Sequence, residues 1–162
     1  MTLEERIEAL EKKIGIYKSV PEEFIKKRWR AEPGGEYYFA MPMGEPAIAT
    51  DNNHGYNDYR YQRGNYFKTK EEAELYDKKM LITQKVKDIA IRLGEPTEDD
   101  WGDSGVAKNY LYIIYKEKSC GYSSDFIAKT QGTIYCLDSN FLNVCLEEIG
   151  EEDLKLILLD LW

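Results

Sequence analysis

The residues with the greatest capacity for chemistry lie in one polar stretch, residues 51–58, which reads Asp-Asn-Asn-His-Gly-Tyr-Asn-Asp. Asp51, Asn53 and Asp58 carry oxygen atoms of the kind that calcium binds. A twelve-residue calcium loop ends on a Glu, whereas this stretch has Gln62 at that position. We therefore expect no metal here, and a flexible connection whose side chains bond to their own backbone.

Catalysis finds little support in the other reactive residues. His54 is the sole histidine, and Cys120, Cys136 and Cys145 include no CxxC pair. The sequence has no GxxxxGKS/T or GxGxxG loop for a nucleotide and no HExxH zinc motif. The odd number of cysteines argues against a disulfide framework and indicates reduced thiols. We therefore expect a non-enzyme without a cofactor.

Two arginines stand among the aromatic residues near this stretch. Residues 59–62 alternate aromatic and polar side chains, and this two-residue period predicts a strand with Tyr59 and Tyr61 on one face. Arg60 and Arg63 are candidate ligands for an anion, because a guanidinium pairs with phosphate or carboxylate oxygens. An aromatic pocket between two structural units, with either arginine, would capture a small ligand such as a nucleotide signal.

Acidic residues surround Trp101 in the turn between residues 95 and 103. Such a cluster can imitate a row of phosphates, bind a cation or solubilise a loop. If it engages a partner, exposed tyrosines would supply the anchors, because aromatic residues dominate interface energetics. The candidate partner-binding residues are Glu98, Asp99, Asp100, Trp101, Asp103, Tyr56, Tyr59 and Tyr61.

The charge of the chain restricts its partners. Thirty acidic and 22 basic residues among 162 give a net charge of -8, which disfavours attraction to phosphate backbones. The partners we expect are basic proteins, neutral surfaces or small ligands. No secretory signal precedes residue 20 and no apolar run is long enough to span a membrane, so we expect a soluble, cytoplasmic protein.

One basic patch, residues 26–30, interrupts the acidic chain and contains Trp29. A single-stranded nucleic-acid binder would place such cations on phosphates and stack bases on the Trp. We expect instead that Trp29 enters the core and that the cations stay on a solvated face. Direct binding of nucleic acid is the alternative that the net charge disfavours.

The chain repeats one pattern twice, and this repeat predicts the architecture. Near residues 29–94 and again near 97–162, a Trp is followed by an aromatic run, a turn, a Gly-containing segment and an amphipathic helix. Two such units covering each other's apolar faces predict a single α+β domain over residues 19–162. Its hydrophobic content of 43% is sufficient for a core.

Local signals place the elements within this domain. Thr69 and Glu72 form a capping box that opens the longest helix, and its stripe of Leu75, Ile82, Val86, Ile89, Ala90 and Leu93 should face a sheet. The strand from Asn109, apolar on both faces, should be central. We expect the C-terminal leucine-rich helix in the core, with an interaction patch as the alternative. Besides 59–62 and a short strand ending at 67, the expected strands are 36–41, 47–50, 109–116, 122–129 and 133–136, and the expected helices are 70–93, 140–149 and 151–162.

A separate N-terminal helix is expected over residues 1–18. Its apolar residues are spaced four, three, four and three apart, which is the heptad rhythm of a coiled coil. We expect this seam to pack on the helix's own domain, and a homodimer is the alternative. The seam consists of Leu3, Ile7, Leu10, Ile14 and Tyr17.

Three segments resemble a known group of proteins. Pro33-Gly34-Gly35-Glu36-Tyr37-Tyr38-Phe39, the string from Gly64-Asn65-Tyr66-Phe67-Lys68-Thr69 to Glu74, and Gly132-Thr133-Ile134-Tyr135 with 147–155 are similar to small uncharacterised phage and prophage proteins of Gram-positive bacteria. Cys136-Leu137-Asp138 departs from the pattern of that family. The resemblance implies a phage accessory protein of the bacterial cytoplasm and carries no functional residue with it.

Charge and resemblance together favour a non-enzymatic binder of a bacterial host or defence protein. Its acidic surface would compete with nucleic acid for a groove, as an anti-CRISPR type inhibitor does. The alternatives are a protein that sequesters a nucleotide signal and a single-stranded nucleic-acid binder.

Overall fold

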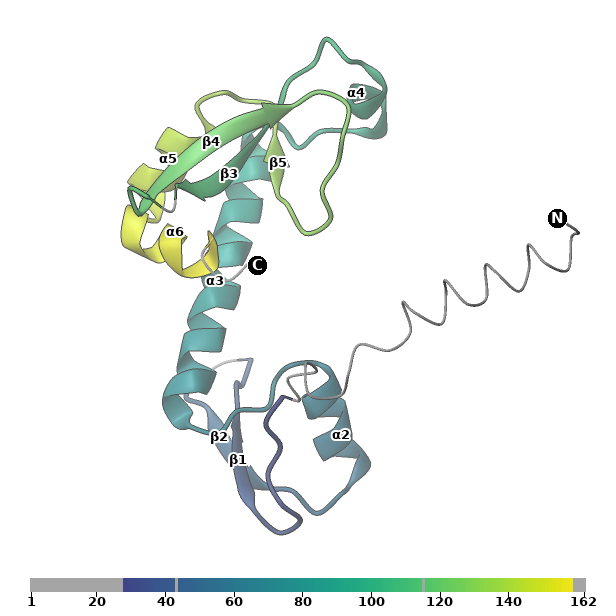
Figure 1. Ribbon diagram of the computed structural model, residues 1–162, viewed down its shortest axis with the longest axis vertical. Helices are drawn as coiled ribbons and strands as arrows, with labels where there is room; N and C mark the ends of the chain where they lie inside the picture. Colours follow the sequence, from purple (N-terminus) through teal and green to yellow (C-terminus); the bar gives the residue numbers. More distant parts are fainter. Residues whose placement is uncertain (1–27, 43, 115, 159–162) are drawn as a thin grey trace, which may run out of the picture.

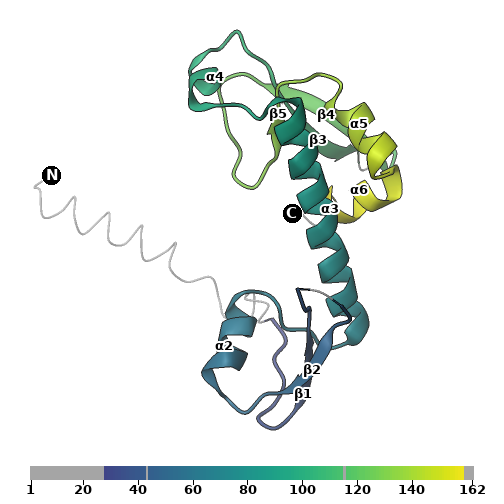
Figure 2. The same cartoon turned by 180° about the vertical axis from the view of Figure 1, so that it is seen from behind.

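The protein has an α+β fold with two small antiparallel sheets, as predicted. The computed structural model describes residues 28–42, 44–114 and 116–158, so the seam Leu3, Ile7, Leu10, Ile14 and Tyr17 lies outside the described residues. Within these residues the sheets lie toward opposite ends of one long helix, α3 (Lys70–Gly94), and form an N-terminal and a C-terminal lobe (Figures 1 and 2). No helix among them is long and apolar enough to cross a membrane.

The N-terminal lobe is a short hairpin with a helix packed beside it. Strand β1 (Glu36–Phe39) pairs antiparallel with β2 (Ala47–Thr50), with Tyr37 opposite Ala49. On the other edge of β1, Tyr38 and Phe67 exchange two backbone hydrogen bonds of 2.9 Å. Helix α2 (Gly55–Gln62) follows β2 and completes the lobe. The strand pair at 36–41 and 47–50 is thus confirmed, with β1 two residues shorter than predicted.

Helix α3 connects the lobes and begins where the sequence predicts. Thr69 Oγ1 accepts a hydrogen bond from Glu72 N, and the Glu72 carboxylate accepts one from Thr69 N, which is a complete capping box. Gly94, with a φ of 113°, ends the helix in the left-handed conformation that glycine adopts readily. Twenty-five residues at about 1.5 Å each make a spacer of about 37 Å.

The C-terminal lobe contains the apolar core. Its sheet has the order β4-β3-β5, so β3 (Lys108–Ile114) is central between β4 (Ser119–Asp125) and β5 (Tyr135–Cys136), as predicted. Helices α5 (Phe141–Glu148) and α6 (Glu151–Leu158) pack with α3 on this sheet, and α4 (Glu98–Gly102) precedes it. The core includes Val86, Ile89, Leu111, Ile113, Phe141, Cys145, Leu154 and Leu158.

The predicted strand at 59–62 is wrong, because these residues form the second half of α2. Tyr59 and Tyr61 therefore do not share a face: Tyr59 is exposed, whereas the ring of Tyr61 lies edge-on against Tyr66, 5.5 Å between centroids. An alternation over only four residues is also compatible with a helix. In α2, Asn57 is buried and Tyr61, four residues later, lies on the same side of the helix. The connection predicted for 51–58 is confirmed only for residues 51–54, where Asn53 N donates to the side chain of Asp51, whereas residues 55–58 belong to α2.

Smaller differences concern boundaries in the C-terminal lobe. The turn predicted at residues 118–121 lies earlier, since Lys118 takes a φ of 50° and β4 already begins at Ser119. Gly121 then lies within the strand, directly under Tyr112, where a Cβ would approach the ring to 2.9 Å. On α3, Ile82, Val86, Ile89 and Ala90 are buried as predicted, whereas Leu75 is exposed.

Leu154 tests the assignment of the C-terminal helix to the core. It is fully buried, and Leu154→Ala should lower the free energy of unfolding by about 2–5 kcal/mol through lost contacts and a cavity. Leu81→Ala, on an exposed position of α3, is the matched control and should cost about 0.5 kcal/mol or less. Urea denaturation followed by circular dichroism measures both. Equal effects of the two changes would contradict burial of α6.

Candidate functional site

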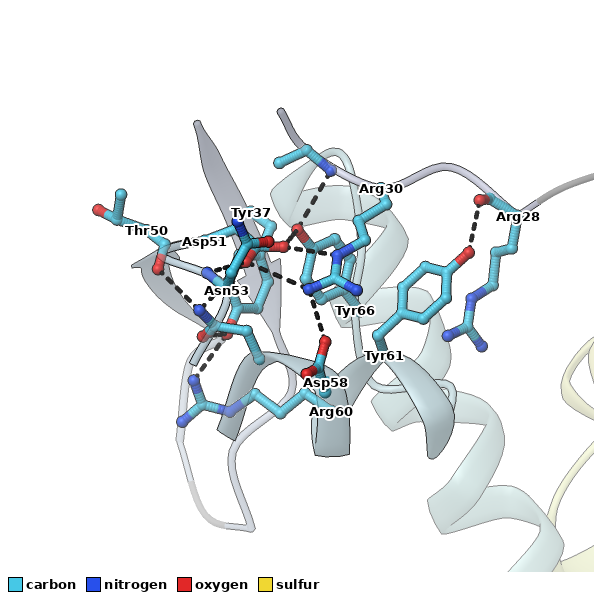
Figure 3. A network of polar contacts seen from close by, with 12 residues as sticks. Arg28, Arg30, Tyr37, Thr50, Asp51, Asn53, Asp58, Arg60, Tyr61 and Tyr66 are labelled. Atoms are coloured by element: carbon cyan, nitrogen blue, oxygen red, sulfur yellow. Dashed lines mark hydrogen bonds and ion pairs between the residues drawn. The ribbon is translucent and has the colours of Figure 1, made fainter. Parts of the chain in front are cut away.

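A fully buried carboxylate, Asp51, organises the N-terminal lobe (Figure 3). It accepts five hydrogen bonds. Two come from Arg30, at 2.8 Å from Nε and 3.3 Å from Nη2. The others come from Asn53 N at 2.9 Å, Asn57 Nδ2 at 3.2 Å and the Tyr66 hydroxyl at 2.9 Å. The polar stretch thus directs its first carboxylate inward, and both of its oxygens accept hydrogen bonds from protein donors.

These contacts determine the charge states in the network. Hydrogen bonds from Arg30 hold the pKa of Asp51 well below its usual range, and Asp51 together with Asp58 raises the pKa of Arg30. Burial and its hydrogen bond to Asp51 raise the pKa of Tyr66 to about 12. The carboxylate is therefore ionised and the phenol neutral across the physiological pH range.

Two tyrosines extend the network toward the surface. The rings of Tyr37 and Tyr66 stack with centroids 3.8 Å apart and planes 8° apart. The Tyr37 hydroxyl donates to Asn57 Oδ1 at 2.9 Å and accepts from Arg60 Nη1 at 2.9 Å. The guanidinium of Arg60 also lies 3.5 Å from the centroid of Phe39. Arg60 is thus held in place by a hydrogen bond and a cation–π contact.

Beside this network lies an open, mostly apolar groove of about 720 Å³. Its walls are the end of β1 with the residues that follow, and the first turns of α2 (Figure 1). Tyr56 and Tyr59 are 77% and 56% exposed, more than is usual for aromatic residues that merely pack in the core. The described lining residues are Phe39, Ala40, Met41, Pro42, His54, Gly55, Tyr56, Tyr59, Arg60 and Asn65.

The groove unites some of the predicted site residues and separates others. Tyr56, Tyr59 and Arg60 line it together, and Arg63 lies beside it with its guanidinium 5.2 Å from the Tyr59 ring. Tyr61 points away, and its hydroxyl donates to the Arg28 carbonyl at 2.8 Å. The groove therefore lies within the N-terminal lobe and is not the aromatic pocket that was predicted between two units.

The prediction for the basic patch is wrong for Trp29 and Arg30 and right for Arg28, which is exposed, while residues 26 and 27 lie outside the described residues. Trp29 is 38% exposed, whereas Arg30 reaches the buried Asp51 and also pairs with Asp58 at 2.7 Å. The guanidinium of Arg28 lies 4.1 Å from the centroid of Tyr61. The buried carboxylate of Asp51 explains the position of Arg30, because a buried charge is costly unless an opposite charge lies beside it.

The acidic cluster lies in the other lobe and divides into two parts. Asp100 accepts hydrogen bonds from Thr97 in a capping box, and Asp103 Oδ1 accepts one from Gly105 N at 2.7 Å, so both stabilise local backbone. Trp101 packs edge-on against Tyr135, 4.9 Å between centroids. Glu98 and Asp99 are exposed on α4. These two carboxylates are the part of the predicted cluster best placed for a partner.

Charge is distributed unevenly along the chain. Residues 1–69 contain 11 basic and 11 acidic residues, whereas residues 70–162 contain 11 basic and 19 acidic residues. The whole net charge of -8 thus belongs to the part of the chain that begins with α3. A neutral lobe with an aromatic groove and an acidic lobe are separated by the length of that helix.

The cysteines are poorly suited to nucleophilic catalysis. Cys136 and Cys145 are buried, and burial raises the pKa of both thiols, that of Cys145 to about 12. Burial also raises the pKa of Cys120, which is half-buried. Thiols protonated at neutral pH are weak nucleophiles. Across the described ranges, no cluster of three or more His, Cys, Asp or Glu side chains could hold a metal ion.

Sequence reasoning missed several residues of this site. The side chain of Asn65 bonds to both polar backbone groups of Ala40. It accepts a hydrogen bond from the Ala40 N–H at 2.6 Å and donates one to the Ala40 carbonyl at 2.9 Å. The sequence signal that could have identified Asn65 is its position after Gly64, in the segment from Gly64 to Glu74 that resembles the phage proteins. Met41 and Pro42 carried no such signal beyond their hydrophobicity. Comparison with family models, with curated proteins and with solved structures finds no match for the chain.

Asp51→Asn tests the role of the buried carboxylate. The amide keeps the shape but loses the charge that Arg30 and the other donors require, so the free energy of unfolding should fall by about 2–3 kcal/mol at pH 7. Asp58→Asn removes the exposed partner of the same Arg30 and should cost about 1 kcal/mol or less. Urea denaturation with Trp fluorescence measures both variants.

The lowered pKa of Asp51 also predicts that the free energy of unfolding depends on pH. Because the pKa of Asp51 is lower in the folded than in the unfolded protein, its contribution is complete above the unfolded value of about 3.9. This contribution to stability is lost as the pH falls from that value through the pKa of Asp51 in the folded protein. The difference between wild type and Asp51→Asn should stay constant from pH 7 to about 5 and shrink below about 4. A constant difference down to pH 2 would contradict the assignment.

Proposed function

We propose that the chain is a non-enzymatic binding protein that blocks or modulates a bacterial host or defence protein. The groove of the N-terminal lobe is its primary contact surface. The exposure of Tyr56 and Tyr59 over an apolar groove is the observation that carries the proposal. Aromatic side chains in such positions provide most of the binding energy in protein interfaces.

Several residues of the groove are already held by contacts within the lobe. Asn65 fixes the backbone of Ala40, and Tyr37 and Phe39 orient Arg60. Groups that are held in place lose less conformational entropy on binding, and this favours affinity. The network around Asp51 therefore supports the groove although it lies outside it.

The acidic lobe supplies the second part of the proposal. Glu98 and Asp99 are exposed on α4, which lies in the C-terminal lobe (Figure 1). An acidic surface steers association toward a basic partner and competes with nucleic acid for it. With the resemblance to phage proteins, this arrangement favours an anti-CRISPR type inhibitor. Binding of nucleic acid by the basic patch is less favoured, because Arg28 and Arg30 engage Tyr61 and Asp51.

Capture of a partner from a Gram-positive bacterial lysate tests this function. Immobilised wild-type chain should retain one protein in stoichiometric amount, and that protein should lose its bound nucleic acid. Tyr59→Ala should reduce retention about tenfold or more, the loss of one interface anchor. Tyr122→Ala is the control, since Tyr122 is 51% exposed but lies on β4 of the other lobe, and it should change retention less than twofold.

The acidic lobe is tested in the same assay. Glu98→Lys with Asp99→Lys should weaken retention and stop the release of nucleic acid. Glu117→Lys with Glu147→Lys changes the net charge equally at other exposed sites and should have little effect. Retention of no protein, or equal effects of the two charge reversals, would count against the proposal.

One observation favours a second function, the capture of a small anionic ligand. The volume of the groove lies in the range of small-molecule sites, and Arg60 is oriented at its wall. A nucleotide signal that binds there should raise the melting temperature of the wild type but not of Tyr59→Ala. A thermal-shift series with mono-, di- and cyclic nucleotides makes this test. No shift with any of them would remove the second function.

A further inference from the structure

We propose that the groove binds an acidic, apolar linear segment of the partner protein. This inference rests on the proposed function, because it assumes that the occupant is a protein. It adds the chemical class of the segment, which Tyr56, Tyr59, His54 and Arg60 would recognise.

The charge of the groove wall is opposite to that of the chain. Among the described residues that line the groove, the basic side chains are Arg60 and His54, and there is no carboxylate. The chain as a whole has 30 acidic residues, so a wall without one stands apart from the rest of the surface. Arg63, beside Tyr59, adds a third basic group at the rim. An occupant with Asp or Glu is therefore complementary to the groove.

The apolar part of the wall specifies the rest of the segment. Phe39, Met41, Pro42, Tyr56 and Tyr59 supply apolar surface to the lining, which an aromatic or leucine side chain would cover. An occupant with carboxylates alone would leave this surface in water. The segment therefore combines acidic with large apolar residues.

The backbone of the groove indicates how the segment is recognised. Both polar backbone groups of Ala40 are already bonded to the side chain of Asn65. The segment therefore does not extend the sheet at this point, as it would in β-strand addition. Recognition depends on side chains, and a short linear segment suits a groove that is open to solvent.

Selection from a displayed library of random twelve-residue peptides tests the proposal with the full chain as bait. The selected sequences should combine Asp or Glu with Trp, Phe or Leu. The best peptide should bind Tyr59→Ala at least about tenfold more weakly than the wild type.

His54→Asp separates charge from folding. His54 is the N-cap residue of α2 and makes no side-chain capping hydrogen bond, so Asp there should keep or raise the melting temperature. The new carboxylate would repel an acidic peptide, and affinity should fall about fivefold. Asn140→Asp is the matched control, because Asn140 is the N-cap of α5 without a side-chain capping bond and lies in the other lobe. It should leave the affinity unchanged.

The outcomes distinguish this inference from the proposed function. Neutral or basic selected peptides, or unchanged affinity in His54→Asp, would overturn the inference, whereas capture of a partner by Tyr56 and Tyr59 would survive. No selected peptide together with nucleotide stabilisation would overturn both. Selected sequences that match residues 151–162, with self-association lost in Tyr59→Ala, would identify a second copy as the occupant and refute a separate partner.

Discussion

The buried carboxylate of Asp51 is the interaction on which the N-terminal lobe depends. An ionised group without solvent is costly unless donors surround it, and here the donors come from four places in the chain. Arg30 precedes the hairpin, Asn53 and Asn57 belong to the turn and to α2, and Tyr66 follows α2 (Figure 3). One side chain thus joins segments that also meet through the ring of Tyr66, which contacts Trp29, Tyr37 and Tyr61. The positions of the hydrogen-bond donors to Asp51 therefore determine the position of α2 in the lobe.

The groove is a consequence of that arrangement. With Asn57 bound to Asp51 and Tyr37, helix α2 presents Tyr56 and Tyr59 on its other side. Arg60 is drawn back onto Phe39 and the Tyr37 hydroxyl, so it forms part of the wall instead of extending into solvent. Polar contacts in the interior therefore fix aromatic groups at the surface.

Predictions from the sequence were accurate where they depend on local contacts and failed where they depend on contacts between distant residues. The Thr69–Glu72 capping box, the central strand β3 and the pair β1–β2 depend on neighbours or simple periodicity, and these predictions are confirmed. Helix α2 was missed because it depends on partners of Asn57 and Tyr61 far along the chain. Arg30 and Asp51 are 21 residues apart, and no local pattern connects them. Tyr56, Tyr59 and Arg60 were identified from residue type, but their common groove was not.

The two lobes are stabilised in different ways. The C-terminal lobe packs an apolar core between the sheet and three helices, and its exterior carries charged residues together with exposed apolar side chains such as Tyr122 and Ile127. Among the described residues of the N-terminal lobe, the interior is formed by stacked tyrosines and a hydrogen-bonded carboxylate. Apolar side chains such as Met41 and Tyr59 are then not required inside. They remain exposed around the groove at one end of α3, while the acidic lobe lies at the other end.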